Sequence, residues 1–234
     1  MSHLVVRQLL IDLEKPFSLR WNGGDAFTSA FMNALSMSFP VGEQFFIDSL
    51  RRGQKELTPE QQIQFAGELK GFIGQEATHR RLHQRFNQHL ENQGQINHWG
   101  PRALKRIAKL ETMNVRHAVA ATAATEHFTA VLAQWLLSNP DFLAQAEARL
   151  QTLWHWHASE ESEHRCTAFD IYKALDGNEA WRLQWMRLTT WYLLTDLLRQ
   201  TINNLWHEGS LFKLSTWRSA WVFLLTKKGL FRSS

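Results

Sequence analysis

The sequence predicts an all-α fold, with a core of four helices followed by two further apolar helices. Apolar residues recur at steps of three and four over long stretches, and no stretch shows the alternation expected of a strand. Five prolines and twelve glycines punctuate these stretches. Hydrophobic residues make up 44% and charged residues 21% of the 234, which excludes wholesale disorder. This length allows one sizeable core, so residues 1–234 are expected to form a single domain.

The first helix is expected from about Asp25 to Arg52, with a bend at Phe39-Pro40 because proline cannot donate a helical hydrogen bond. Thr58-Pro59-Glu60 opens the second helix, since Thr is a good N-cap and Pro suits the first helical position. This helix is expected to end near Glu91.

A polar, Gly-containing loop from Asn92 to Pro101 precedes the third expected helix, Arg102 to Leu137. Ser138-Asn139-Pro140-Asp141 then breaks the chain and starts a fourth helix, which ends near Asp176-Gly177-Asn178. The four helices, about residues 25–176, are the predicted core.

Two C-terminal helices, Glu179 to His207 and Leu211 to Lys228, contain six of the eleven Trp residues. We expect these rings to cover the core. The alternative is contact with a membrane surface, which Trp217 and Trp221 followed by Lys227-Lys228 suggest.

Each of the four core helices carries a glutamate in the middle of its apolar face: Glu43, Glu76, Glu126 and Glu161. In the fourth helix, His157, Glu161 and His164 fall within an arc of about 60°. A buried, unpaired carboxylate costs several kcal/mol, and four together repel one another. No Lys or Arg lies on these faces near the carboxylates, so two divalent metal ions are the expected counter-charge.

The order of these residues repeats in the two halves of the core. A lone Glu43 precedes Glu76-x-x-His79, and a lone Glu126 precedes Glu161-x-x-His164. Ferritin-like di-iron proteins use this arrangement, with one Glu from each of two helices and Glu-x-x-His from each of the other two. The sequence therefore predicts a ferritin-like four-helix core. Carboxylates mixed with imidazoles favour two iron ions, with a manganese–iron pair as the alternative.

Three segments resemble a bacterial family labelled "predicted metal-dependent hydrolase", and the likeness covers nearly the whole chain. The segments are Ser38-Phe-Pro-Val-Gly-Glu-Gln-Phe-Phe46, Gly74-Gln-Glu-Ala-Thr-His79 and Trp156-His-Ala-Ser-Glu-Glu-Ser-Glu-His164. The run His157-x-x-x-Glu161-x-x-His164 is also similar to the di-iron site of p-aminobenzoate N-oxygenase, where a third histidine joins the usual ligands. That resemblance implies the ligands Glu43, Glu76, His79, Glu126, His157, Glu161 and His164.

Two neighbours of the expected ligands need a role as well. His83, one turn beyond His79, is either a ligand or a hydrogen-bonding partner of one, and Glu160 is expected to be such a partner. The alternative for His157 is that it is also a hydrogen-bonding partner of a ligand rather than a ligand itself. Aromatic residues near the site (Phe46, Phe72 and Trp154) are expected to line an apolar pocket. The sequence shows no acid or base separate from the ligands.

The function that these features favour is a di-iron oxidase or oxygenase, which needs O₂, an electron donor and an apolar or amine small-molecule substrate. One alternative is two-metal hydrolysis, although the sequence shows no Arg cluster, no Gly-rich anion loop, no His-Glu-x-x-His and no Gly-x-Ser-x-Gly. A third is iron handling without an organic substrate.

Net charge and cysteine content limit the possible binding partners and the cellular compartment. A net charge of +4 without a long basic block gives no support for nucleic-acid binding. The single Cys166 excludes an internal disulfide and indicates a reducing compartment. Because neither a secretory leader nor an apolar run long enough for a membrane span is evident, a cytoplasmic location is expected. A homodimer is compatible with the sequence.

Overall fold

The computed structural model describes residues 4–227 and 229–232, and these residues fold as a bundle of α-helices. Among them there is no strand, only one isolated bridge between Asn22 and Ala146. The prediction of an all-α bundle is therefore confirmed. In the same residues, no helix combines the length and the hydropathy that crossing a bilayer requires.

The first two helices begin at the predicted positions, each behind a capping side chain. α1 (Ala26–Lys55) follows Asp25, whose carboxylate accepts a hydrogen bond from the backbone N–H of Thr28. α2 (Pro59–Asn92) begins with a reciprocal pair of hydrogen bonds between Thr58 and Gln61. Each helix therefore starts where a side chain satisfies free backbone N–H groups.

α1 continues through Pro40 rather than ending there. Proline has no N–H, so the carbonyl of Ser36, one turn earlier, loses its helical partner. That carbonyl instead accepts a hydrogen bond of 2.9 Å from the side-chain amide of Asn87 on α2. Because of Pro40, the Ser36 carbonyl is available for this hydrogen bond, which links α1 to α2.

The prediction of one helix over Arg102–Leu137 was wrong. The chain forms α3 (Trp99–Glu111) and α4 (Val115–Ser138), separated by Thr112-Met113-Asn114. The Asn114 side chain accepts from the backbone N–H of Arg116, a local bond that competes with helix continuation and caps α4.

The prediction of one continuous helix from Asp141 to Asp176 was also wrong. A 3₁₀ turn, η1 (Pro140–Leu143), precedes α5 (Ala148–Glu163) and α6 (Thr167–Ala174). The chain leaves α5 at His164, whose imidazole lies beside Glu126 of α4. This break therefore coincides with a contact between α4 and the end of α5, which the helical periodicity of the sequence could not predict.

The C-terminal helices are α7 (Glu179–His207) and α8 (Leu214–Leu225). α7 has the predicted bounds, with the Asn178 side chain capping its N-terminus. α8 starts three residues later than expected, and Lys228 lies outside the described residues.

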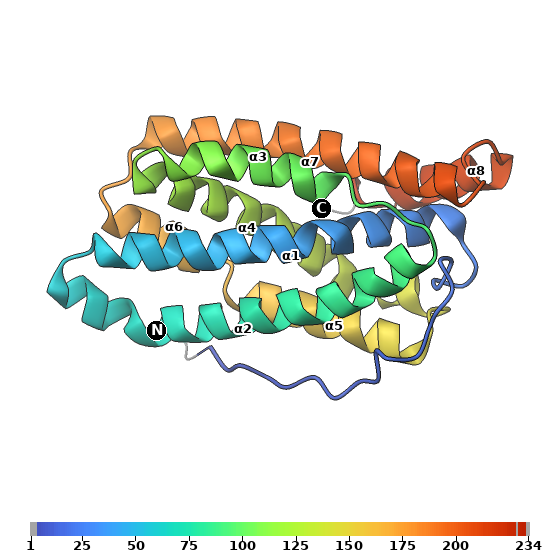
Figure 1. Cartoon of the computed structure of the whole chain (residues 1–234), viewed down its shortest axis with the longest axis horizontal. Helices are drawn as coiled ribbons and strands as arrows, with labels where there is room; N and C mark the ends of the chain where they lie inside the picture. Colours follow the sequence, from blue (N-terminus) through green and yellow to red (C-terminus); the bar gives the residue numbers. More distant parts are fainter. Residues whose placement is uncertain (1–3, 228, 233–234) are drawn as a thin grey trace.

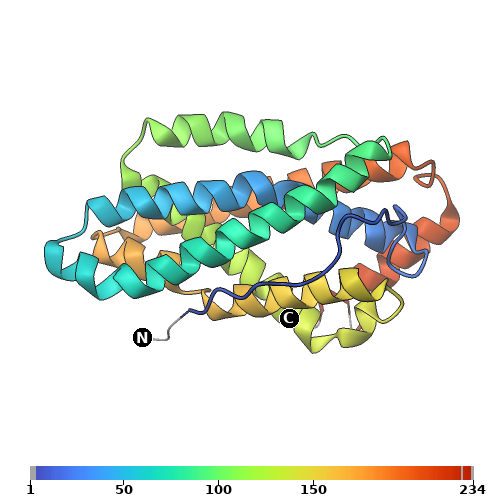
Figure 2. The ribbon, with the colours of Figure 1, turned by 60° about the horizontal axis from the view of Figure 1, so that its bottom comes forward.

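The helices lie in three layers (Figure 1). α1 and α4 form the middle layer, with α2 and α5 on one side and α3 and α7 on the other. The N-terminal segment runs along the outside of α2 and α5 (Figure 2). It approaches α2 so closely that a Cβ atom at Gly71 or Gly74 would lie 2.4 Å from Leu4 or Val6. Glycine at these two positions therefore allows the segment to cover the bundle.

Candidate metal centre

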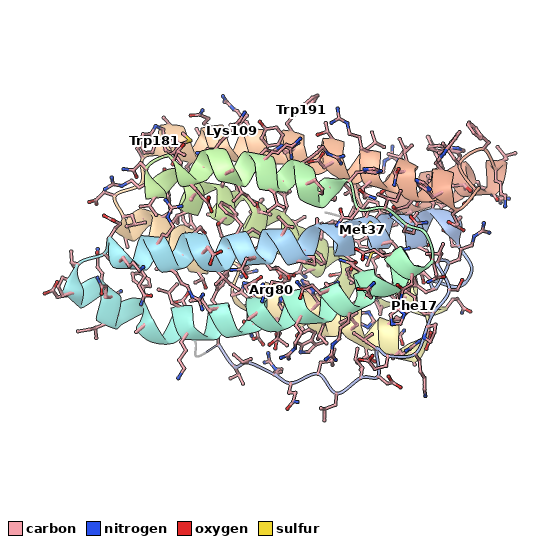
Figure 3. All side chains as sticks on the ribbon, viewed as in Figure 1. Phe17, Met37, Arg80, Lys109, Trp181 and Trp191 are labelled. Atoms are coloured by element: carbon pink, nitrogen blue, oxygen red, sulfur yellow. The ribbon has the colours of Figure 1, made fainter. Side chains whose placement is uncertain are left out.

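All seven residues predicted as ligands meet inside the bundle, and each is at most 4% exposed. They come from four helices: Glu43 from α1, Glu76 and His79 from α2, Glu126 from α4, and His157 and Glu161 from α5, with His164 at the end of α5. Figure 3 shows side chains in the space between the ribbons of α1 and α2, near the labelled Arg80.

Two groups of potential ligand atoms can be distinguished by distance. Side-chain atoms of Glu76, His79, Glu161 and His164 all lie within 4.8 Å of one another, and the same holds for Glu43, His79 and His157. His79 belongs to both groups, so the two groups are contiguous.

Glu161 and His164 connect the remaining members of the cluster. One oxygen of Glu161, Oε1, lies 3.0 Å from Nε2 of His157 and 3.4 Å from Nδ1 of His79. His164 lies between two further carboxylates, with Nδ1 2.9 Å from Glu126 Oε2 and Nε2 3.3 Å from Glu76 Oε1. The seven side chains thus form one continuous cluster.

Many polar atoms of this cluster have no hydrogen-bond partner in the part of the chain that the structure describes. They include both oxygens of Glu43 and of Glu76, one oxygen each of Glu126 and Glu161, Nδ1 of His79 and Nε2 of His164. Buried polar atoms are almost always satisfied, because leaving one unpaired costs about 1–3 kcal/mol. These atoms are the types that bind divalent metals, so the cluster fits metal ions by both position and chemistry.

Protons balance the charge of the cluster when no metal does so. Burial raises the pKa of Glu43 and Glu76 well above the ordinary value and that of Glu126 to about 7. Burial opposes protonation of His79, but the neighbouring carboxylates of Glu160 and Glu161 raise its pKa to about 9. Metal binding must therefore displace protons from these groups.

The metal-stripped protein is expected to lose stability as the pH rises from about 6.5 to 9. Despite burial, neighbouring carboxylates raise the pKa of both His79 and His164 to about 9 from 6.5. A raised pKa means that the folded state binds more protons, so its stabilising effect is complete below pH 6.5 and is lost as the pH rises through 9. One unit of pKa corresponds to about 1.4 kcal/mol, so the two imidazoles together should account for several kcal/mol.

Urea unfolding at a series of pH values, with a chelator present, measures this loss. In the same series with excess metal, the fall should be much smaller, because metal replaces the protons on the imidazoles. A chelated protein whose stability stays constant or rises over this range would contradict the prediction.

His83 and Glu160 lie behind the imidazoles of the cluster, as hydrogen-bonding partners. Glu160 Oε2 lies 3.0 Å from Nε2 of His79, which leaves Nδ1 of that ring facing the cluster. Arg7 of the N-terminal segment in turn donates to Glu160, at 3.2 Å from Nη1. His83 Nε2 lies 2.8 Å from Nδ1 of His157.

A chain of hydrogen bonds determines which nitrogen of His157 is free. The Asn87 amide nitrogen donates to the Ser36 carbonyl, so its oxygen must accept from the Ser36 hydroxyl, at 2.7 Å. The hydroxyl then accepts from Nδ1 of His83, at 2.8 Å. Burial lowers the pKa of His83 well below its ordinary value, so this ring is neutral and its Nε2 accepts from Nδ1 of His157. Nε2 of His157 is therefore left unprotonated, and its 3.0 Å approach to Glu161 Oε1 brings two acceptor atoms together, as expected of two atoms that can bind the same metal ion.

Ser36→Ala is expected to weaken binding of one metal ion by roughly tenfold, since it removes the acceptor that fixes this chain of tautomers. Ser49→Ala is the matched control, because Ser49 is also buried on α1 but pairs with Thr122. Metal titration of the two variants gives the comparison. Equal affinities for both would show that the hydrogen-bond chain does not orient a ligand.

Sequence reasoning missed the supporting residues Arg7, Ser36 and Asn87. Asn87 did carry a signal, because it continues the buried polar stripe of His79 and His83 at steps of four residues. Arg7 carried none, since it lies in a segment without periodicity and meets Glu160 from 153 positions away.

An apolar cavity of about 410 Å³ lies against the cluster, between α1, α3, α4 and α7. Glu43, His157 and Glu161 form part of its wall. Phe46 and Trp154 line it as predicted, whereas Phe72 does not and instead packs its ring against His164, with centroids 4.8 Å apart. The cavity runs from Phe31 to Phe46 along α1, about 22 Å at 1.5 Å per residue. It is therefore elongated along the bundle.

Comparison with known protein families gave a match over nearly the whole chain. A family model described as "Predicted metal-dependent hydrolase" matches residues 5–234. Neither the curated proteins nor the solved structures gave a match. The description agrees with the predicted metal dependence and, on the reaction, with the hydrolase alternative rather than with oxidation. The match spans nearly all of the sequence, and the chain belongs to the predicted metal-dependent hydrolase family.

Proposed function

We propose that this chain is a two-metal enzyme that uses O₂ to oxidise an elongated apolar molecule. The observation that carries the proposal is the contact between the two features of the site. A buried cluster of carboxylates and imidazoles forms part of the wall of a long apolar cavity. Ligand cavities with mostly apolar walls and a few placed polar groups are typical of small-molecule sites.

The ligand atoms support a pair of ions, for which iron is the proposed metal. Glu43, His79 and His157 would hold one ion, and Glu126 with His164 the other. Glu76 and Glu161 each lie within 4.0 Å of both His79 and His164, and they would complete the ligand set of the pair. The resemblance of the His157 to His164 run to p-aminobenzoate N-oxygenase supports the third imidazole, and the order of the ligands supports a ferritin-like site.

A bound pair of redox-active metal ions, kept reduced by the electron donor, would supply the electrons and the coordination sites for O₂ chemistry. The residues of the chain would position the substrate and exclude water from the metal cluster. Phe39 packs on both His83 and His157, with ring centroids 4.7 Å apart in each case, and so shields this edge of the cluster from water. The apolar walls would hold a hydrocarbon portion of the substrate beside the ligands.

Hydrolysis by the same two ions is the second candidate, and the family description favours it. The cavity gives it less support, because a hydrolysable ester or phosphate needs polar contacts. Of the two cationic residues that line the cavity, Arg106 is paired with Asp196 and only Lys109 has no ion pair among the described residues.

One set of measurements separates the candidates. The purified protein is analysed for metal, loaded anaerobically with Fe(II), and then exposed to O₂ in the presence of a long-chain aldehyde or amine. The proposal expects two iron ions per chain, oxygen uptake and an oxidised product. Retention of zinc with cleavage of esters or phosphates, and no oxygen uptake, would establish the hydrolase instead. Particles that hold far more than two iron ions per chain would establish iron storage.

A further inference from the structure

The outer face of α7 carries a continuous apolar stripe that nothing in the described protein covers. Trp191, Leu194, Leu198, Ile202 and Trp206 follow one another at steps of three or four residues, which places them on one side of the helix. Trp191 is 66% and Trp206 60% exposed. Figure 3 shows Trp191 at the outer edge of the molecule, on the same side as Lys109 of α3. The prediction that the C-terminal Trp rings cover the core therefore does not hold for these two.

At the end of α7 the stripe meets the loop before α8, and further exposed apolar residues follow along the chain. Trp206 contacts Phe212 with ring centroids 5.9 Å apart, and Phe212 is followed by the exposed residues of α8. On α8, Trp217 and Trp221 are exposed, the latter to 63%. We call the exposed side chains from Trp191 to Leu225 the α7–α8 face. Soluble proteins rarely leave so large an apolar surface in water, and such surfaces mark interaction sites.

The charges on this face are of one sign. Exposed cations lie along this segment of the chain or just beyond its ends, and none has an ion pair among the described residues; they are Arg187, Arg199, Lys213, Arg218, Lys227 and Arg232. The acidic residues of the same segment are already neutralised. Glu179 pairs with Arg182, Asp196 with Arg102 and Arg106, and Glu208 with Arg20.

We propose that the α7–α8 face binds to the surface of an anionic lipid bilayer. Trp rings with apolar neighbours insert at the boundary between headgroups and acyl chains, and surrounding Lys and Arg residues attract anionic headgroups. No described helix can cross the bilayer, so the protein would lie on it. A second copy of this chain fits the face less well, because a symmetric contact would bring the unpaired cations of both copies together.

Vesicle co-sedimentation of the full chain tests the proposal. We expect binding to vesicles of phosphatidylcholine mixed with phosphatidylglycerol, weakening with salt, and much less binding to pure phosphatidylcholine. Trp191→Gln combined with Trp206→Gln should reduce partitioning by roughly tenfold or more. Arg187→Gln combined with Arg199→Gln should reduce it by about fivefold for each cation removed.

The matched controls are Ile63→Gln and Lys70→Gln, which change exposed residues on α2. Helical content and metal content, measured for every variant, show that the fold and the metal centre are intact. Because none of the substituted residues belongs to the metal cluster, vesicle binding and oxygen reactivity can fail independently.

Equal binding of the parent chain and both double variants would overturn the proposal. So would sedimentation as a dimer without any vesicle binding, together with loss of that dimer in the Trp variant, because that result assigns the face to a second copy. Equal partitioning into pure phosphatidylcholine and into the anionic mixture would also overturn it, since it removes the role of the cations.

Discussion

Glu161→Ala is expected to leave the protein with at most one metal ion per chain and to lower turnover by at least about a hundredfold. Glu161 lies within 3.0 Å of His157 and 3.4 Å of His79, and it belongs to the same group of ligand atoms as Glu76 and His164. No other carboxylate of the cluster is as close to as many imidazoles. Its removal should therefore disturb both ions rather than one.

Stability should fall with the metal content in this variant. A metal ion that binds only the folded state stabilises it, and that contribution disappears when the ion is lost. In the metal-stripped state the effect has the same sign, because nearby imidazoles outweigh burial and hold the pKa of Glu161 well below its ordinary value. Loss of this carboxylate removes one counter-charge from those imidazoles.

Metal analysis and thermal unfolding of the variant provide the measurement. Glu163→Ala is the matched control, because Glu163 lies two residues further on α5 but pairs with Arg7 near the surface. The control is expected to keep two ions. If Glu161→Ala also keeps full metal content, then Glu161 is not a ligand and the proposed pair of ions is wrong.

Ala121→Leu is expected to lower oxidation of a long apolar substrate by at least about tenfold while both metal ions stay bound. Ala121 is buried on α4 and lines the cavity, so a larger side chain takes up space that the substrate needs. In an apolar pocket, each methylene of misfit changes the free energy by about 1–3 kcal/mol. A shorter substrate that does not reach this part of the cavity should be less affected.

The ratio of the rates for decanal and hexadecanal, each compared with the parent chain, measures this effect. Ala108→Leu is the control, since Ala108 lies on the exposed side of α3 and outside the cavity lining. An unchanged rate for both substrates in Ala121→Leu, with metal content and fold intact, would exclude the cavity as the substrate site. The metal centre itself would remain open to other substrates.

The sequence alone determined that the fold is all-α and which residues meet inside the bundle. Helical periodicity shows which face of each helix is buried, and a carboxylate on a buried face demands a counter-charge. These two rules, applied to Glu43, Glu76, Glu126 and Glu161, place all four in the interior, and the structure brings them together there. Capping by Asp25 and Thr58 could likewise be predicted, because it depends on residues only three positions apart.

Only the tertiary structure decided the breaks at Thr112-Met113-Asn114 and after His164. It also decided that Ser36 and Asn87, 51 positions apart, determine the free nitrogen of His157, and that Arg7 supports His79 through Glu160. Local periodicity cannot reveal such features, because each depends on how segments distant in the chain pack against one another. The same holds for the outer face of α7, whose apolar pattern indicates burial although the fold leaves it exposed.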